Sequence, residues 1–535
     1  MFSFDITALR TYNWDTMNPL PGSQNNNSAL TGKVFPLIIA LFALNAIIYI
    51  WLFRFLPLQD YPDWLFQGHI FSEMLKGHAA GSYSLLRYPI PNTISTLIIG
   101  LLGLAFSPEA SGKLFLSCYT LLFVFSSFYL FRQFTRGEKS PLILIPLLFI
   151  FNNNFFLGNI NYLTGLSLLF LGMGLLFKHK DSPEKAGMWS ILILSLLIFL
   201  SHGIIYFIWL AFLAVFALLH AKRKQFAGLA LGTAPSLALL AGYILSRPAG
   251  QDAAATSGAL QFLKFKTASA IGCFSILPHF YPYLSAGDLL MKAAVFVNYA
   301  VCAGILLAFI FSLKTGIAGL KENKLVIGAA ALCLFLFLAA PSFLAGVVDP
   351  GQRFLYPAFW LALAMLSQRI PPRLNKVLAC FIFFLLAGQG VYLYSYAGGV
   401  SRDMERIYAG LNKLSAEAPA QSINEAFFDY EKTFQRPCAR PPLASVYPLG
   451  RLCYYSDIEK ELSPTIFDSG ILYYKGSSPQ PRINSVSEIA AAKIFPGRII
   501  ITGEKRGNAK IAGLLKEKYK TLIEEEHSVL LERKP

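Results

Sequence analysis

Two carboxylates that stand three residues apart follow the first long apolar run of the chain. They lie in residues 55–69 (FLPLQDYPDWLFQGH), where Asp60 and Asp63 flank Pro62. Partial dehydration raises the pKa of a carboxyl group, and such a group suits a general base that takes a proton from an acceptor hydroxyl or amine. The second carboxylate would then position a cation or polarise the first. The structural alternative is helix capping, because acidic residues beside a proline are common at helix starts.

Further polar side chains lie on the same stretch. Gln59 precedes Asp60, while His69 and Glu73 are four residues apart and share one face of a helix. We expect Gln59 and His69 to contact substrate. Asp60, Asp63 and His69 are also the residues that would hold a divalent cation such as Mg²⁺ or Mn²⁺, if the reaction uses one. The alternative for His69 and Glu73 is an ordinary surface pair.

Two arginines stand in segments that we expect outside the membrane. Arg87 precedes Tyr88, and Arg353 ends the motif DPGQR, residues 349–353, between two apolar runs. A guanidinium at the membrane surface can bind a lipid phosphate through paired, charge-assisted hydrogen bonds. The alternative for each is an ion pair or an interface anchor, and Asp349 is the nearest partner for Arg353.

A histidine and a group of asparagines mark two helix turns on the same side. His202 in the sequence Ser-His-Gly could contact a phosphate or the acceptor, or it could be a structural histidine. Asparagine amides could bind sugar hydroxyls, and Asn161 is the one that we retain as a candidate. The alternative is that these amides satisfy the backbone of a broken helix end. The group comprises Asn152, Asn153, Asn154, Asn159 and Asn161.

The elements that must position these residues are membrane helices. The chain has 535 residues, of which 55% are hydrophobic and 14% charged, and its mean hydropathy is +0.51. A soluble domain has about 25% charged residues, and a run of about 18 apolar residues is enough to cross a bilayer. We therefore predict a polytopic α-helical membrane protein. The net charge of +16 comes largely from short loops between apolar runs, which is a topology signal and does not indicate a nucleic-acid partner.

Hydropathy predicts eleven membrane-spanning helices within a membrane domain of residues 34–396. Residues 1–33 carry Arg10 and Lys33 and are predicted to be a cytoplasmic segment, with no cleavable signal peptide. The predicted spans are 34–55, 113–132, 141–156, 160–177, 188–201, 204–220, 226–245, 289–312, 325–345, 355–368 and 377–396.

The distribution of positive charge decides how the apolar segment 90–106 is placed. Five loops carry three basic residues each, and all five face the cytoplasm only if 90–106 does not cross. We therefore predict one external loop, 56–112, with two juxtamembrane helices, the first over 63–76. A second external loop covers 246–288. The basic loops contain Arg132, Arg136 and Lys139; Lys178, Lys180 and Lys185; Lys222, Arg223 and Lys224; Lys314, Lys321 and Lys324; and Arg369, Arg373 and Lys376.

Residues 397–535 are predicted to form an extracytoplasmic α/β domain, because charge rises and the apolar runs shorten there. Patterning predicts strands over 498–502 and 528–532 and a helix over 508–519. Cys438 and Cys453 lie in this domain and could pair in an oxidising compartment.

The acidic motif QDYPD (59–63), the basic helix end over 131–137 and the late DPGQR loop (349–353) resemble the GT-C superfamily. These are integral-membrane glycosyltransferases that use polyprenyl-phosphate-linked sugars, and the resemblance implies a bacterial enzyme of the inner membrane. It also implies that Asp60 is the base of an inverting transfer to a glycan, lipid or protein acceptor, with Arg353 near the donor phosphate. The chain lacks a DxD or WWDYG-type signature, which disfavours the oligosaccharyltransferase branch and leaves a metal requirement open.

Two other functions stay open on the sequence. A transporter or flippase of a lipid-linked sugar would need the same helices, although the spans lack central charges and the chain lacks a clear internal repeat. A polymerase or ligase for surface polysaccharide would share the donor and differ in the acceptor. In the loop 246–288, Arg247 is the only arginine, which weakly disfavours the polymerase or ligase.

Overall fold

A computed structural model describes the helical part of the chain almost continuously and the C-terminal part in short segments. Gln59, Arg87, Cys438 and Cys453 lie outside the described residues. The described ranges are 27–58, 60–77, 83–85, 90–135, 140–179, 187–220, 223–246, 259–278, 288–318, 324–341, 343–344, 347–366, 372–412, 421–424, 472–474, 498–502, 512–513, 515–524 and 528–534.

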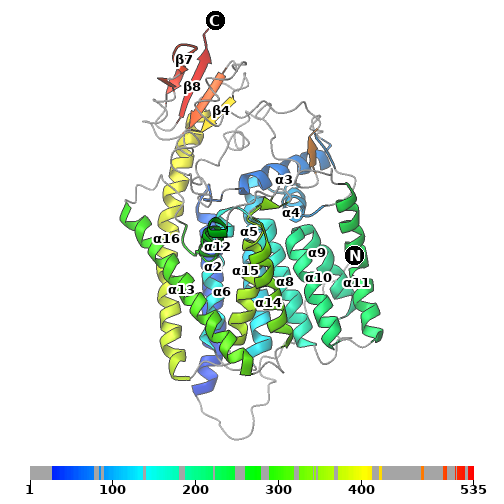
Figure 1. The fold of residues 1–535 in the computed structure, drawn as a ribbon. Coiled ribbons are helices and arrows are strands. Elements are labelled where there is room, and N and C mark those ends of the chain that lie inside the picture. Colours follow the sequence, from blue (N-terminus) through cyan, green and yellow to red (C-terminus); the bar gives the residue numbers. More distant parts are fainter. Residues whose placement is uncertain are drawn as a thin grey trace.

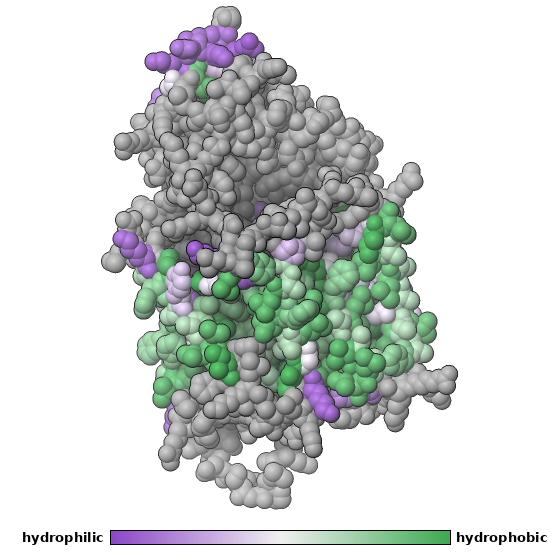
Figure 2. Space-filling model, viewed as in Figure 1, coloured by the Kyte–Doolittle hydropathy of each residue, from purple (hydrophilic) through white to green (hydrophobic). Residues whose placement is uncertain are grey.

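A bundle of long apolar helices makes up most of the molecule (Figure 1). Ten of the eleven predicted spans are helices, close to the predicted bounds. Figure 2 shows apolar residues gathered in a band over these helices and hydrophilic residues over the C-terminal strands. The ten helices are α2 (Asn27–Leu52), α5 (Pro108–Thr135), α8 (Ile160–Lys178), α9 (Met188–Ser201), α10 (Gly203–His220), α11 (Arg223–Ser246), α13 (Asp288–Ala318), α14 (Lys324–Ala339), α15 (Gln352–Leu366) and α16 (Pro372–Asn412).

Length and composition identify an integral membrane protein. Among the described residues, five helices are long and apolar enough to cross a bilayer, namely those within α5, α8, α10, α11 and α16. Five further apolar helices of 10–17 residues accompany them. Large apolar side chains on α2 and α16, including Leu41, Phe384 and Val391, are more than half exposed, as expected for helices that face lipid.

The predicted span 141–156 is not one continuous helix, which corrects the prediction. It consists of a 3-10 turn η1 (Pro141–Leu144), the short helix α6 (Ile145–Leu148) and the short helix α7 (Asn153–Phe156). The chain leaves the helix after Leu148 and restarts where the side chain of Asn152 accepts a hydrogen bond from the backbone N of Phe155 at 3.2 Å. Asn152 therefore caps α7. This agrees with the structural alternative, in which the asparagine amides satisfy the backbone of a broken helix end.

The two helices that were predicted within residues 56–112 are present. α3 (Tyr61–Leu75) packs on α4 (Ile94–Leu102), and both lie at one end of the bundle (Figure 1). Nine residues span about 14 Å, less than half of a hydrocarbon core of about 30 Å, so α4 does not cross. The close approach of α3 to α4 depends on a small residue at Gly68, because a Cβ there would lie 2.5 Å from the Ile99 side chain.

Helix α12 (Ala259–Cys273) lies within the second predicted loop and was not predicted. It packs against α15, whose buried Trp360 is the centre of the aromatic core. The ring of Trp360 lies 5.7–6.1 Å from four phenylalanine rings, those of Phe123, Phe131, Phe149 and Phe170.

α16 continues to Asn412, so the helix runs past the domain boundary that was predicted at 396. Beyond it, β4 (Gln421–Asn424), β6 (Arg498–Thr502), β8 (Ser528–Arg533) and β7 (Tyr519–Glu524) form a sheet in that order. β4 is parallel to β6, and the other pairs are antiparallel. The predicted strands 498–502 and 528–532 are confirmed. The predicted helix over 508–519 does not reach its predicted end, because Tyr519 begins β7.

Two small antiparallel pairs complete the structure. β2 (Phe343–Leu344) pairs with β3 (Val347–Val348) in the loop before α15. β1 (Tyr83–Leu85), from the first external loop, pairs with β5 (Leu472–Tyr474) from the C-terminal region. The β1–β5 pair places a part of the C-terminal region at the same end of the bundle as α3 and α4.

Candidate functional site

Asp60 occupies the N-cap position of α3, but its side chain makes no capping hydrogen bond. The capping alternative therefore does not describe its carboxylate. Pro62 in the first turn of α3 suits a helix start, and the backbone N of Asp60 donates to the carbonyl O of Leu157 at 3.2 Å. Asp60 is half-buried and is held against the turn that joins α7 to α8.

The other residues of the acidic stretch follow along α3. Asp63 is the third residue of the helix, although its side chain is not among those described. His69 is half-buried two turns further on. Glu73 forms an ion pair with Lys76 at 2.9 Å, so the neighbour expected for His69 has a cationic partner of its own. No three His, Cys, Asp or Glu side chains that could hold a metal converge among the described residues, and the Mg²⁺ or Mn²⁺ site stays a prediction.

Arg353 and His202 come together on one tyrosine at the start of α8. The guanidinium carbon of Arg353 lies 5.9 Å from the centre of the Tyr162 ring, and the Tyr162 hydroxyl donates to the carbonyl O of Arg353 at 3.2 Å. The His202 ring meets the same tyrosine edge-on, with ring centres 5.4 Å apart. Tyr162 thus brings together Arg353, which lies 191 positions away in the sequence, and His202, which lies 40 positions away.

Burial governs the charge of His202, which forms the one-residue break between α9 and α10. Its side chain is 6% exposed, and its Nδ1 has no hydrogen-bond partner within the described part of the chain. Burial, with a smaller contribution from the positive charge of Arg353, holds the pKa of His202 well below its ordinary value. The imidazole is therefore neutral near pH 7, and it can donate or accept a hydrogen bond beside the permanent cation Arg353.

Asn161 fixes the start of α4. Its side-chain O accepts from the backbone N of Ser95 at 2.9 Å, and its side-chain N donates to the carbonyl O of Asn92 at 3.2 Å. Asn92 has a positive φ of 67°, which an asparagine tolerates better than most residues. The oxygen and the nitrogen of the Asn161 amide both hydrogen-bond to backbone groups. This agrees with the structural alternative, in which the asparagines satisfy the backbone.

Asp60, Arg353 and His202 each contact the segment 157–162, of which Asn161 is a member. This segment comprises the C-cap residue of α7, the turn residues Gly158 and Asn159, and the first three residues of α8. The first turn of α8 carries no acidic residue, and the N-terminus of a helix carries a partial positive charge that attracts anions. The backbone of Asp60, the guanidinium of Arg353 and the neutral ring of His202 therefore lie against one short segment at the positive end of α8.

Lys266 is a residue near this site that sequence analysis missed. It is 3% exposed, and its Nζ donates to the carbonyl O of Phe337 at 2.5 Å and to that of Ala340 at 2.6 Å. It lies three residues before Ser269, whose carbonyl O accepts from the side chain of Gln352 at 3.2 Å. Helix α12 thus holds both sides of the loop that carries Arg353. The available signal was a lysine within an apolar stretch (QFLKFK), but Lys264 gives the same signal and is exposed.

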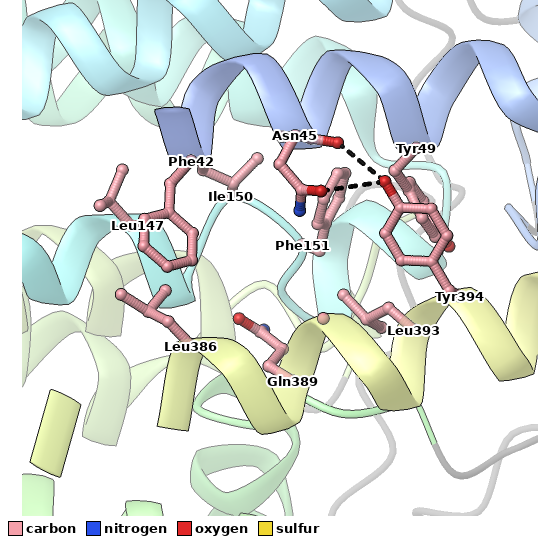
Figure 3. Close-up of a pocket in the computed structure, with 12 residues that line it drawn as sticks. Phe42, Asn45, Tyr49, Leu147, Ile150, Phe151, Leu386, Gln389, Leu393 and Tyr394 are labelled. Carbon is pink, nitrogen blue, oxygen red and sulfur yellow. Dashed lines mark hydrogen bonds between the residues drawn. The ribbon is translucent and has the colours of Figure 1, made fainter. Parts of the chain in front are cut away.

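A pocket elsewhere in the bundle is not the site. Figure 3 shows it between α2 and α16, with Leu147, Ile150 and Phe151 on its inner wall. The Tyr394 hydroxyl donates to the carbonyl O and side-chain O of Asn45 at 3.3 and 3.1 Å. No candidate residue lines this pocket.

No protein-family model matches the sequence. No curated protein matches it either. Among solved structures, the chain is similar to the crystal structure of ArnT from Cupriavidus metallidurans bound to undecaprenyl phosphate, with a TM-score of 0.49 and 10% sequence identity over 94% of this chain and 98% of that chain. Similarity at this level does not establish an activity, and the lipid is a ligand of that protein. The functional argument for this chain therefore rests on its own residues around the start of α8.

Proposed function

We propose that the protein is a membrane glycosyltransferase that moves a sugar from a polyprenyl-phosphate-linked donor to an acceptor hydroxyl or amine. One observation carries the proposal. At one end of an apolar helix bundle, under two juxtamembrane helices, the acid Asp60 and the cation Arg353 both contact the segment 157–162 at the positive end of α8. A lipid phosphate needs such a cationic, membrane-level site, and an acceptor needs a nearby base.

The residues divide the reaction between them. Asp60 takes the proton from the acceptor as the acceptor atom forms a bond to the anomeric carbon. The bond from that carbon to the phosphate oxygen breaks, its electron pair leaves with the polyprenyl phosphate, and the configuration inverts. Arg353 and the N-terminus of α8 stabilise the negative charge of the leaving phosphate. The neutral His202 supplies a hydrogen bond without adding a second positive charge.

The proposed topology follows from the same arrangement. The five basic loops lie in the cytoplasm, and Asp60, Arg353, His202 and the C-terminal sheet lie on the opposite side of the inner membrane. The pairing of β1 with β5 supports a common side for the first external loop and the C-terminal region. The acceptor, whether a glycan, lipid or protein, would approach from that side.

Purified protein in lipid vesicles tests the proposal. The vesicles receive a panel of polyprenyl-phosphate sugars and an envelope extract as the source of acceptor. Released polyprenyl phosphate is measured by mass spectrometry, which does not require the acceptor to be known. Wild-type protein should release the lipid, and Asp60→Asn should lower the rate by about 10²-fold or more, because it removes the base and keeps the shape.

Two outcomes would contradict the proposal. Turnover of Asp60→Asn at the wild-type rate would remove Asp60 from the mechanism. Movement of the lipid-linked sugar across the bilayer by the wild type, with no polyprenyl phosphate released, would favour the flippase. Glu73→Gln serves as the control, because it changes a carboxylate on the same helix that pairs with Lys76.

A further inference from the structure

The turn between α7 and α8 is built on a glycine that touches the backbone of the acidic stretch. Gly158 has a φ of +74°, in the left-handed region that glycine adopts readily. A Cβ at this position would lie 2.4 Å from the backbone N of Asp60 and 2.6 Å from that of Tyr61. Both are backbone atoms at the start of a helix and cannot rotate away, so a larger residue would displace Asp60 itself.

Two hydrogen bonds attach the same stretch to consecutive carbonyls of this turn. The backbone N of Asp60 donates to Leu157 O at 3.2 Å, and the indole N of Trp64 donates to Gly158 O at 3.1 Å. Trp64 lies in the first turn of α3, one turn after Asp60. The start of α3 is therefore held at two points, with Gly158 in van der Waals contact between them.

The turn also sets the position of the phosphate-binding end of the site. Asn159 follows Gly158 as the N-cap of α8, and Tyr162, in the first turn of α8, contacts both Arg353 and His202. The distance between the acid and the cationic end is thus set by the backbone between residues 157 and 162. A shift of this backbone changes the separation of the two groups without removing either of them.

From this geometry we infer that Gly158 and Trp64 are positioning residues, which hold Asp60 in the place where it takes the proton from an acceptor that attacks the donor bound at the start of α8. The inference rests on the proposed function, in which Asp60 is the base. Neither residue needs to contact substrate. Loss of either should therefore slow the chemical step and leave donor binding almost unchanged.

Gly158→Ala tests the close contact, and Gly187→Ala is its matched control. Gly187 also has a φ of +74°, but the nearest atom to a Cβ there is the Ser190 side-chain O at 3.8 Å. Both variants therefore place an alanine at the same positive φ, and only the first pushes on Asp60. We expect kcat to fall by about 100-fold in Gly158→Ala with the donor KM within about twofold of wild type, and both constants to stay at wild-type values in Gly187→Ala.

Trp64→Phe tests the inference without added bulk, which matters if Gly158→Ala fails to fold. Its control is Trp51→Phe, since the Trp51 indole N also makes a 3.1 Å hydrogen bond, to Ser117 on α5. We expect Trp64→Phe to lower kcat about fivefold with an unchanged donor KM, and Trp51→Phe to keep the wild-type kcat.

The outcomes separate the inference from the proposed function. Wild-type kcat in Trp64→Phe, or equal losses in the two glycine variants, would overturn the positioning role while the transferase proposal stands. A raised donor KM at unchanged kcat would also overturn it. Absence of transfer by the wild-type protein would overturn the proposed function and this role together.

Discussion

Tyr162 is the side chain through which two basic groups share one small site. Its ring lies under the Arg353 guanidinium and against the edge of His202. An arginine keeps its proton in proteins, so the histidine must be the group that gives up its charge. Burial enforces this by lowering the pKa of His202. The Tyr162 ring is therefore shared by a permanent cation and a neutral imidazole.

The lowered pKa of His202 predicts that acid destabilises the fold. The unfolded chain protonates this histidine below about pH 6.5 while the folded chain does not, so the unfolded state binds more protons. The free energy of unfolding should fall by about 1.4 kcal/mol for each pH unit below 6.5, until the lower, folded-state pKa is reached.

Thermal unfolding in detergent between pH 5 and 7.5 checks this prediction. His202→Gln should show a shallower loss of stability with acid than the wild type. His220→Gln, at the opposite end of α10, should keep the wild-type slope. The same slope in all three proteins would mean that His202 is protonated in the folded state.

Ionisable candidate residues could be identified from the sequence, whereas contacts between backbone segments could not. Asp60, Arg353 and His202 were identifiable because each is an ionisable residue at the end of an apolar run. Gly158 was not, since one sequence contains many glycines and only the folded structure shows that this one touches Asp60. Lys266 was missed for a similar reason, because burial distinguishes it from Lys264 and depends on where α12 packs.

Among the elements, α12 connects the site to the surrounding bundle. Lys266, Ser269 and Cys273 lie on one face of this helix at intervals of three and four residues. Lys266 donates to the Phe337 and Ala340 carbonyls at the end of α14. The Ser269 carbonyl accepts from the side chain of Gln352. The Cys273 carbonyl accepts from the hydroxyl of Tyr356. Helix α12 thus holds the first turn of α15, which carries Arg353.

Lys266→Met should destabilise the protein and weaken donor binding. The variant removes two charge-assisted hydrogen bonds from a buried site, and the relief of burying an ammonium offsets part of the loss. A net loss of about 1–3 kcal/mol is expected, together with a higher donor KM, because the loop before Arg353 loses its support.

Lys264→Met is the control, since that side chain is on the same helix and exposed. Thermal unfolding and donor titration of the two variants check the prediction. Equal melting temperatures and equal donor KM values would show that α12 does not hold the Arg353 loop.

Hydropathy located the long helices well, because a membrane helix needs a long apolar run and little else. The positive-charge distribution predicted that 90–106 does not cross, and α4 is nine residues long, which is too short to span a hydrocarbon core. The break between α6 and α7 was missed because residues 149–156 remain apolar apart from the asparagines. Helix α12 was missed because its mixed composition resembles a loop.

In the molecule as a whole, α3 and α4 lie at the end of the helix bundle that is nearer the C-terminal sheet (Figure 1), and Asp60 is the N-cap residue of α3. The C-terminal strands β6 and β8 are apolar enough to be predicted from the sequence. β4, β5 and β7 were not predicted, since short strands form by pairing with segments that are distant in the sequence. The pairing of Tyr83–Leu85 with Leu472–Tyr474 joins segments that are 387 positions apart in the sequence. No local sequence pattern predicts such a pairing.

The proposed function requires a lipid phosphate to bind between Asp60 and Arg353. A cryo-electron microscopy map of the protein in nanodiscs with a polyprenyl phosphate tests it most directly, because the electron-dense phosphate marks its own position. We expect phosphate density at the N-terminus of α8, within hydrogen-bond reach of the Arg353 guanidinium and on the side of the turn that faces Asp60. Phosphate density bound elsewhere, with the start of α8 left unoccupied at saturating lipid, would contradict it.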